Sequence, residues 1–169
     1  MKYLLILISF IRVTAVHSQT DSIEAPYKKF PSFPPVTLKL PDNTSFTKAD
    51  LPKKKPVMLM IFSPDCDHCK HETRDLLKNI DLFDNTEIVM ATMMPFDSMM
   101  KFRDKYQLAE HANIIVGQDT HFFLAPFYKL SYLPFLAFYD KKGKLISVFQ
   151  GTMDIGKAAA ELKKTSESD

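Results

Sequence analysis

The chain contains two cysteines, Cys66 and Cys69, and two residues separate them. A structural disulfide is one interpretation, because exported domains often carry them. A bridge that closes so short a loop removes little entropy from the unfolded chain, so it would stabilise the fold very little. The spacing suits redox chemistry better. Cys66 would attack a substrate disulfide, and Cys69, about one helical turn further on, would resolve the mixed disulfide. The expected redox group is the Cys66–Cys69 disulfide itself, with no added cofactor.

The elements around the pair favour a reactive first cysteine. Residues 57 to 62 are apolar throughout and too few for a buried helix, which predicts a central strand covered on both faces. Residues 69 to 80 carry apolar side chains on one face and predict a helix. Cys66 would precede that helix, where free N–H groups and the helix dipole favour a thiolate. His68, next to Asp67, either adds positive charge that tunes the thiol or is a solvated residue at the helix start.

Metal binding is the alternative chemistry for these thiols. A structural zinc site usually takes a second ligand pair from a distant segment, and none is visible in the sequence. Covalent haem attachment requires histidine after the second cysteine, where this chain has Lys70. A methionine cluster between residues 90 and 100 could hold Cu(I), although core packing is the commoner use of methionine. We therefore expect no metal ligands, and a metallochaperone or binding module for copper or zinc is kept as the second hypothesis. Residues 66 to 72 contain six side chains of types that can bind a metal ion: Cys66, Asp67, His68, Cys69, His71 and Glu72.

The first residues resemble an export signal. Lys2 precedes an apolar run from residue 3 to 11, and small residues follow at 16 to 18, which predicts a secretory signal peptide cut near Ser18. The run is far shorter than the roughly 20 residues that span a bilayer, although an uncleaved anchor remains the alternative. We expect location in the periplasm or cell envelope. The predicted organisation is a signal peptide at 1–18, an extended N-terminal arm at 19–35, a folded domain at 36–164 and a polar tail at 165–169.

Charge argues against a nucleic-acid partner. The chain has 22 basic and 20 acidic side chains, and removal of residues 1–18 takes away Lys2 and Arg12, which leaves 20 of each. A neutral protein has no long-range field that would gather phosphates. The run of lysines at 53–55 is interpreted as a solvated turn. The expected partners are protein thiols and disulfides and a membrane or envelope redox protein, and we expect a monomer.

The remaining pattern alternates buried strands with helices and closes with a hairpin and a helix, which predicts an α/β sandwich around a mixed sheet. Asp154 is a candidate cap for the last helix. The predicted strands lie at 36–40, 87–92, 113–116, 135–139 and 144–149, the predicted helices at 96–108 and from 154 to about 164, and a helical or irregular segment at 121–130.

Residues 62–72 resemble the active-site segment of TlpA/ResA-type thioredoxin-like proteins, in which a buried strand leads into Cys-x-x-Cys. Residues 133–144 are similar to the family's cis-proline loop, strand and turn, and Gly151 to the glycine that ends its next strand. The resemblance covers about residues 36–164. It implies a thioredoxin-like three-layer sandwich with a mixed central sheet flanked by helices, and an enzyme that is a thiol-disulfide oxidoreductase.

The resemblance also assigns roles to single residues. It implies a cis bond before Pro134, which would place the Leu133 backbone beside the cysteines to pair with a substrate strand. Glu72 occupies the position of the family glutamate that tunes thiol ionisation. If Glu72 is buried beside the sulfurs, its charge should disfavour a second negative charge there; if it is exposed, it is an ordinary helix residue.

The chain departs from the family pattern in two places. Asp65 stands where the family usually has tryptophan, and Leu133 replaces a small or β-branched residue. These changes leave the redox class intact but leave substrate preference open. A peroxiredoxin-type peroxidase is disfavoured, because Leu59 and Ser63 occupy the positions of the proline and threonine expected upstream of its reactive cysteine.

Overall fold

The computed structural model describes residues 24–163, which form a seven-stranded sheet of order β2-β1-β5-β4-β3-β6-β7. The predicted signal peptide and polar tail lie outside the described residues. The strands are β1 (Leu38–Lys39), β2 (Ser45–Phe46), β3 (Val57–Ile61), β4 (Glu87–Thr92), β5 (Ile114–Gln118), β6 (Phe135–Tyr139) and β7 (Leu145–Gln150).

The centre of the sheet combines parallel and antiparallel pairs. β3 runs parallel to β4, which runs parallel to β5, whereas β6 is antiparallel to both β3 and β7. Leu59 lies opposite Val89 on one side and Ala137 on the other. Every residue of β3, β4 and β6 is buried, as expected for strands covered on both faces. The predicted mixed α/β architecture is confirmed.

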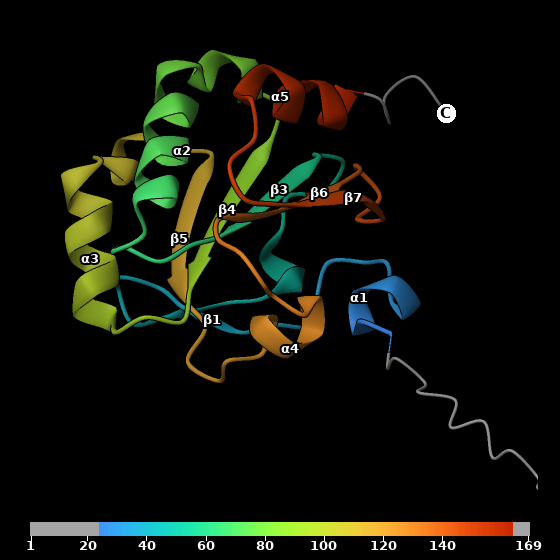
Figure 1. The fold of residues 1–169 in the computed structure, drawn as a ribbon, viewed down its shortest axis with the longest axis horizontal. Helices are drawn as coiled ribbons and strands as arrows, with labels where there is room; N and C mark the ends of the chain where they lie inside the picture. Colours follow the sequence, from blue (N-terminus) through green and yellow to red (C-terminus); the bar gives the residue numbers. More distant parts are fainter. Residues whose placement is uncertain (1–23, 164–169) are drawn as a thin grey trace, which may run out of the picture.

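Helices cover both faces of the sheet, which gives three layers (Figure 1). α2 (Asp67–Lys78), α3 (Phe96–Lys105) and α5 (Ile155–Lys163) pack on one face, and their core includes Phe62, Cys69 and Leu76. The short helices α1 (Pro26–Lys29) and α4 (Leu124–Tyr128) lie on the other face. Successive β3 residues alternate between the two cores, because side chains of a strand point to opposite faces.

Several element boundaries differ from the sequence predictions. α2 begins two residues earlier than expected and is followed by the 3₁₀ turn η2 (Ile80–Phe83). α3 ends at Lys105, because Gln107 adopts the left-handed conformation at φ 53°, which interrupts the helix before η3 (Leu108–Glu110). Asp154 does cap α5, since its carboxylate accepts the Lys157 N–H at 3.0 Å.

The N-terminal arm packs more closely than an extended lead-in. Residues 26–29 form α1 instead of extended chain. The Phe33 N–H donates to Gly143, and the Leu145 N–H donates to Pro31, which ties the arm to the β6–β7 hairpin. Phe33 is 1% exposed and its ring lies 5.4 Å from that of Tyr139. Phe33 of the arm therefore belongs to the core on the α1–α4 face of the sheet, and Tyr27 packs against that core. The 3₁₀ turn η1 (Lys48–Asp50) follows β2 beside the arm.

Candidate active site

Cys66 caps the N-terminus of α2. Directly after β3, the Phe62 N–H donates to the Ala91 carbonyl of β4 and continues the pairing of the two strands. A turn follows, in which the Cys66 N–H donates to the Ser63 carbonyl at 3.1 Å. The Cys66 backbone is extended (φ −76°, ψ 119°), and its sulfur accepts the N–H of Cys69 at 3.3 Å. The sulfur thus takes the place of a usual capping oxygen. Unpaired N–H groups at a helix start stabilise negative charge on the atom that they face.

The two thiols have different surroundings. Cys66 is partly exposed, whereas Cys69 is 0% exposed in the core beneath α2. Burial raises the pKa of the Cys69 thiol, and its hydrogen bond with Cys66 raises this pKa further. Both thiols are free in the structure. The accessible sulfur is the one at the helix start.

The loop before β6 lies against the first thiol. The bond between Leu133 and Pro134 is cis, as the family resemblance implied. The Cys66 thiol donates to the Leu133 carbonyl, with sulfur and oxygen 3.8 Å apart. Gly151 donates its N–H to the Pro134 carbonyl at 2.8 Å, which ties the loop to the end of β7. The structure therefore brings Cys66, Cys69 and the Leu133–Pro134 loop together.

Gln150 holds the same loop and was not expected from the sequence. Its side-chain oxygen accepts the N–H groups of Ser131 and Tyr132 at 2.9 and 3.1 Å. These two bonds fix the backbone immediately before Leu133. An exposed glutamine at the end of a strand carries no signal of this role in a single sequence.

Glu72 is buried, so it is not an exposed helix residue. It is 2% exposed, and its Oε2 accepts the Met153 N–H at 3.0 Å, while its Oε1 has no hydrogen-bond partner. Burial raises the pKa of Glu72 to about 7; the Met153 N–H opposes this shift, and Asp75 and Asp154 add to it. Glu72 thus joins α2 to the loop before α5. Its direct hydrogen bond is to that loop and not to either sulfur.

The residues between the cysteines face solvent. His68 and Asp67 are both exposed. Asp67 accepts a hydrogen bond from Lys70 at 2.9 Å, and this bond lowers the pKa of Asp67. Lys70 also donates to the Asp65 carbonyl at 3.2 Å. The negative charge of Asp67 is therefore balanced mainly by Lys70.

A polar hollow of about 370 Å³ opens beside Asp65, the residue that stands where TlpA/ResA-type proteins usually have tryptophan. Lys70 lines it from α2, and Lys101 and Lys105 line it from α3, about thirty residues along the chain. Tyr106 also lines it and has a buried hydroxyl without a hydrogen-bond partner. Sequence spacing alone could not place α3 against this site.

The donor atoms around the cysteines do not converge on a point. Within residues 24–163, no group of three His, Cys, Asp or Glu side chains is arranged to hold a metal ion. None of the helices in this part of the chain is long and apolar enough to cross a membrane.

Comparisons with known proteins agree with this architecture. Residues 43–166 match the model of a family described as thioredoxin-like domain. A putative thioredoxin from Neisseria meningitidis superposes with a TM-score of 0.65 at 20% identity, over 81% of this chain and 89% of that one. A secreted disulfide oxidoreductase of Mycobacterium tuberculosis gives 0.64 at 19% identity, over 77% and 96%.

An exposed lipoprotein thioredoxin of Streptococcus pneumoniae gives a TM-score of 0.55 at 24% identity, over 75% of this chain and 98% of that one. At these identities the similarity is one of fold. No curated protein sequence matches the chain.

Proposed function

We propose, from the premise that this chain belongs to the thioredoxin-like domain family, that it is an exported thiol-disulfide oxidoreductase acting on protein substrates through Cys66 and Cys69. One observation carries the proposal. The partly exposed Cys66 sulfur lies between the helix-start N–H of Cys69 and the Leu133 carbonyl, and the second thiol is buried directly behind it.

The arrangement supports a two-step exchange. The Cys66 thiolate attacks one sulfur of a substrate disulfide, a new S–S bond forms, and the other substrate sulfur leaves as a thiolate. Cys69 then gives its proton to that thiolate and attacks the Cys66 sulfur, which releases the second substrate sulfur. The substrate gains two electrons, and the site ends as the Cys66–Cys69 disulfide. The reverse sequence would oxidise a substrate dithiol.

We place the substrate chain along the backbone of Leu133. The Leu133 carbonyl lies next to the attacking sulfur, and Gln150 fixes the residues before it. A bound segment that pairs with this backbone would present its disulfide to Cys66. Asp65 and the adjoining lysine-lined hollow would then face the segment in place of a tryptophan ring.

We further propose that the chain is of the TlpA/ResA type and works in the periplasm or cell envelope with a redox partner there. The apolar run at residues 3–11, the buried Glu72 and the secreted or surface-exposed solved relatives support this. N-terminal sequencing of protein recovered from the envelope fraction should begin near Gln19. Recovery only from the cytosol with Met1 retained would contradict export.

Reduction of insulin by dithiothreitol tests the activity. The wild-type chain should accelerate precipitation of the insulin B chain, and Cys66→Ser should abolish the acceleration because the attacking thiol is lost. Ser63→Ala is a matched control, since it removes a hydroxyl three residues away and keeps both thiols. Equal rates for wild type and Cys66→Ser would contradict the proposal.

The order of the two thiols has its own test. Because Cys69 is fully buried and Cys66 is not, iodoacetamide at pH 7 should label Cys66 of the reduced protein at least about tenfold faster. Mass spectrometry of the peptides measures both rates. Faster labelling of Cys69 would reverse the assignment.

A further inference from the structure

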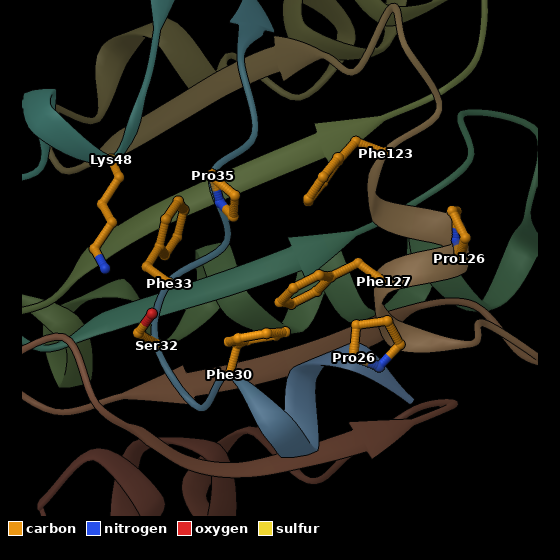
Figure 2. A pocket seen from close by; sticks show the side chains of 9 residues that line it. All are labelled: Pro26, Phe30, Ser32, Phe33, Pro35, Lys48, Phe123, Pro126 and Phe127. Carbon is orange, nitrogen blue, oxygen red and sulfur yellow. The ribbon is translucent and has the colours of Figure 1, made fainter. Parts of the chain in front are cut away.

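An apolar groove of about 590 Å³ lies on the face of the sheet opposite α2. α1, α4 and the N-terminal arm form its walls (Figure 2). Its sides are phenylalanine rings, and Phe123 and Phe127 stack with their centroids 5.4 Å apart. Phe30 is 58% exposed at its edge. Such a volume is typical of a small-molecule site and exposes apolar surface that a ligand would remove from water.

The groove is apolar at one end and polar at the other. In Figure 2, Pro26 and Pro126 lie at one end, and Lys48 and Ser32 lie at the opposite end. Lys48 is exposed on η1, and its ammonium forms no ion pair with any described residue. The groove therefore presents a cation at one end of a hydrophobic channel.

Other lysines reinforce the charge at that end. Two hollows adjoin the groove at Lys48, and no residue that lines the groove or either hollow is acidic. Three acids outside these linings make contacts of their own: Asp50 accepts the Thr47 N–H, Asp140 accepts the N–H groups of residues 142 and 144, and Glu87 pairs with Lys55, which reduces the contribution of Lys55 to the positive charge. The lysines lining the two hollows, besides Lys48, are Lys29, Lys142 and Lys144 in one and Lys53, Lys54, Lys55, Lys141 and Lys142 in the other.

We propose that this groove binds a single-chain anionic amphiphile of the fatty-acid class, with its alkyl chain between the phenylalanine rings and its carboxylate at Lys48. Burial of the alkyl chain supplies affinity, and the lysines fix its direction. A neutral peptide would leave the lysine end unused, and a cationic ligand would be repelled by it. This site lies apart from Cys66 and does not depend on the proposed redox function.

Isothermal titration of the full chain with laurate, below its critical micelle concentration, tests the proposal. Mass spectrometry first establishes the N-terminus of the purified protein. We expect one laurate per chain, with Lys48→Glu weakening binding about threefold to tenfold and Phe30→Ala about tenfold. Both side chains are exposed, so the fold should survive, and circular dichroism checks this.

Two control variants make the same types of substitution at residues outside the groove. Lys101→Glu reverses a charge in the hollow beside Asp65, and Leu82→Ala removes an apolar side chain that is 44% exposed. Neither should change laurate affinity by more than twofold. Equal loss with Lys101→Glu would place the ligand in the other hollow and overturn the proposal.

Three other results would also overturn it. One is the absence of laurate binding. Another is equal affinity for lauryl alcohol, which has the same chain but no charge. The third is concentration-dependent dimerisation that is abolished by Phe30→Ala and unaffected by laurate. The groove would then be an interface between two copies of the chain.

Discussion

Replacement of Glu72 by Gln tests how the buried carboxyl affects the stability of the fold. The pKa of Glu72 is about 7 in the folded protein, compared with about 4.5 for an ordinary glutamate. The folded state therefore binds the proton more tightly than the unfolded chain does. The stabilisation is complete below about pH 4.5 and is lost as the pH rises through about 7.

The magnitude follows from the shift. A difference of about 2.5 pKa units corresponds to about 3 kcal/mol, since each unit is worth about 1.4 kcal/mol. The amide of Gln is shaped like the protonated carboxyl, and its oxygen can accept the Met153 N–H as Oε2 does. At pH 5 the variant and wild type should be similarly stable. Between pH 5 and pH 8 the free energy of unfolding of wild type should fall by about 2.5 kcal/mol relative to the variant, since part of the full stabilisation of about 3 kcal/mol is already lost at about pH 5.

Urea unfolding at pH 5, 6, 7 and 8 measures the difference. Far-UV circular dichroism is the readout, because the chain has no tryptophan. A Cys66→Ser, Cys69→Ser background removes thiol titration, and the histidines cancel because both proteins carry them. Glu87→Gln is the matched control: burial also raises the pKa of Glu87, but Lys55 opposes that shift, so its effect should be smaller. A difference between wild type and the Glu72 variant that does not change with pH would refute the reasoning.

Two further predictions concern packing and the loop beside Cys66. Gln150→Ala should slow insulin reduction several-fold while changing the melting temperature little, because two exposed hydrogen bonds that fix the loop are lost. Gln118→Ala, which removes a partly buried glutamine at the end of β5, should leave the rate unchanged. Gly117→Ala should destabilise the fold by about 2 kcal/mol, because a Cβ there would lie 2.7 Å from the Leu38 Cβ. Gly156→Ala should cost less in thermal unfolding, because its Cβ would meet only the end of the Asp154 side chain, at 3.3 Å from Oδ1.

The sequence predicts a secondary-structure element best where a single physical property, such as burial, determines that element. Residues 57–62 are apolar at every position and too few for a buried helix, and together these two features identify a strand that is buried on both faces. The apolar pattern predicts the start of α2 two residues too late, because cysteine is not among the usual capping residues and its sulfur nevertheless accepts the Cys69 N–H. The early end of α3 depends on the left-handed backbone of Gln107, for which glutamine gives no signal.

The site was predictable in part. The Cys66–Cys69 pair follows from spacing, but the cis bond at Pro134 was expected only from the family resemblance, since most bonds before proline are trans. The burial of Glu72 depends on α5 packing across α2, more than eighty residues along the chain. Gln150 acts on a loop that is 18 residues away in sequence. Such long-range contacts leave no local pattern.

Capture of mixed disulfides tests the central claim most directly. Cys69→Ser lacks the resolving thiol, so Cys66 should remain linked to substrate proteins after exposure to an oxidised envelope extract. Cys66→Ser is the matched variant, and its buried Cys69 should capture none. Non-reducing gels and mass spectrometry of the linked peptides identify the bonded cysteine. Adducts through Cys66 in the first variant alone are the predicted result, and adducts through Cys69 in the second, or none in the first, would contradict the account.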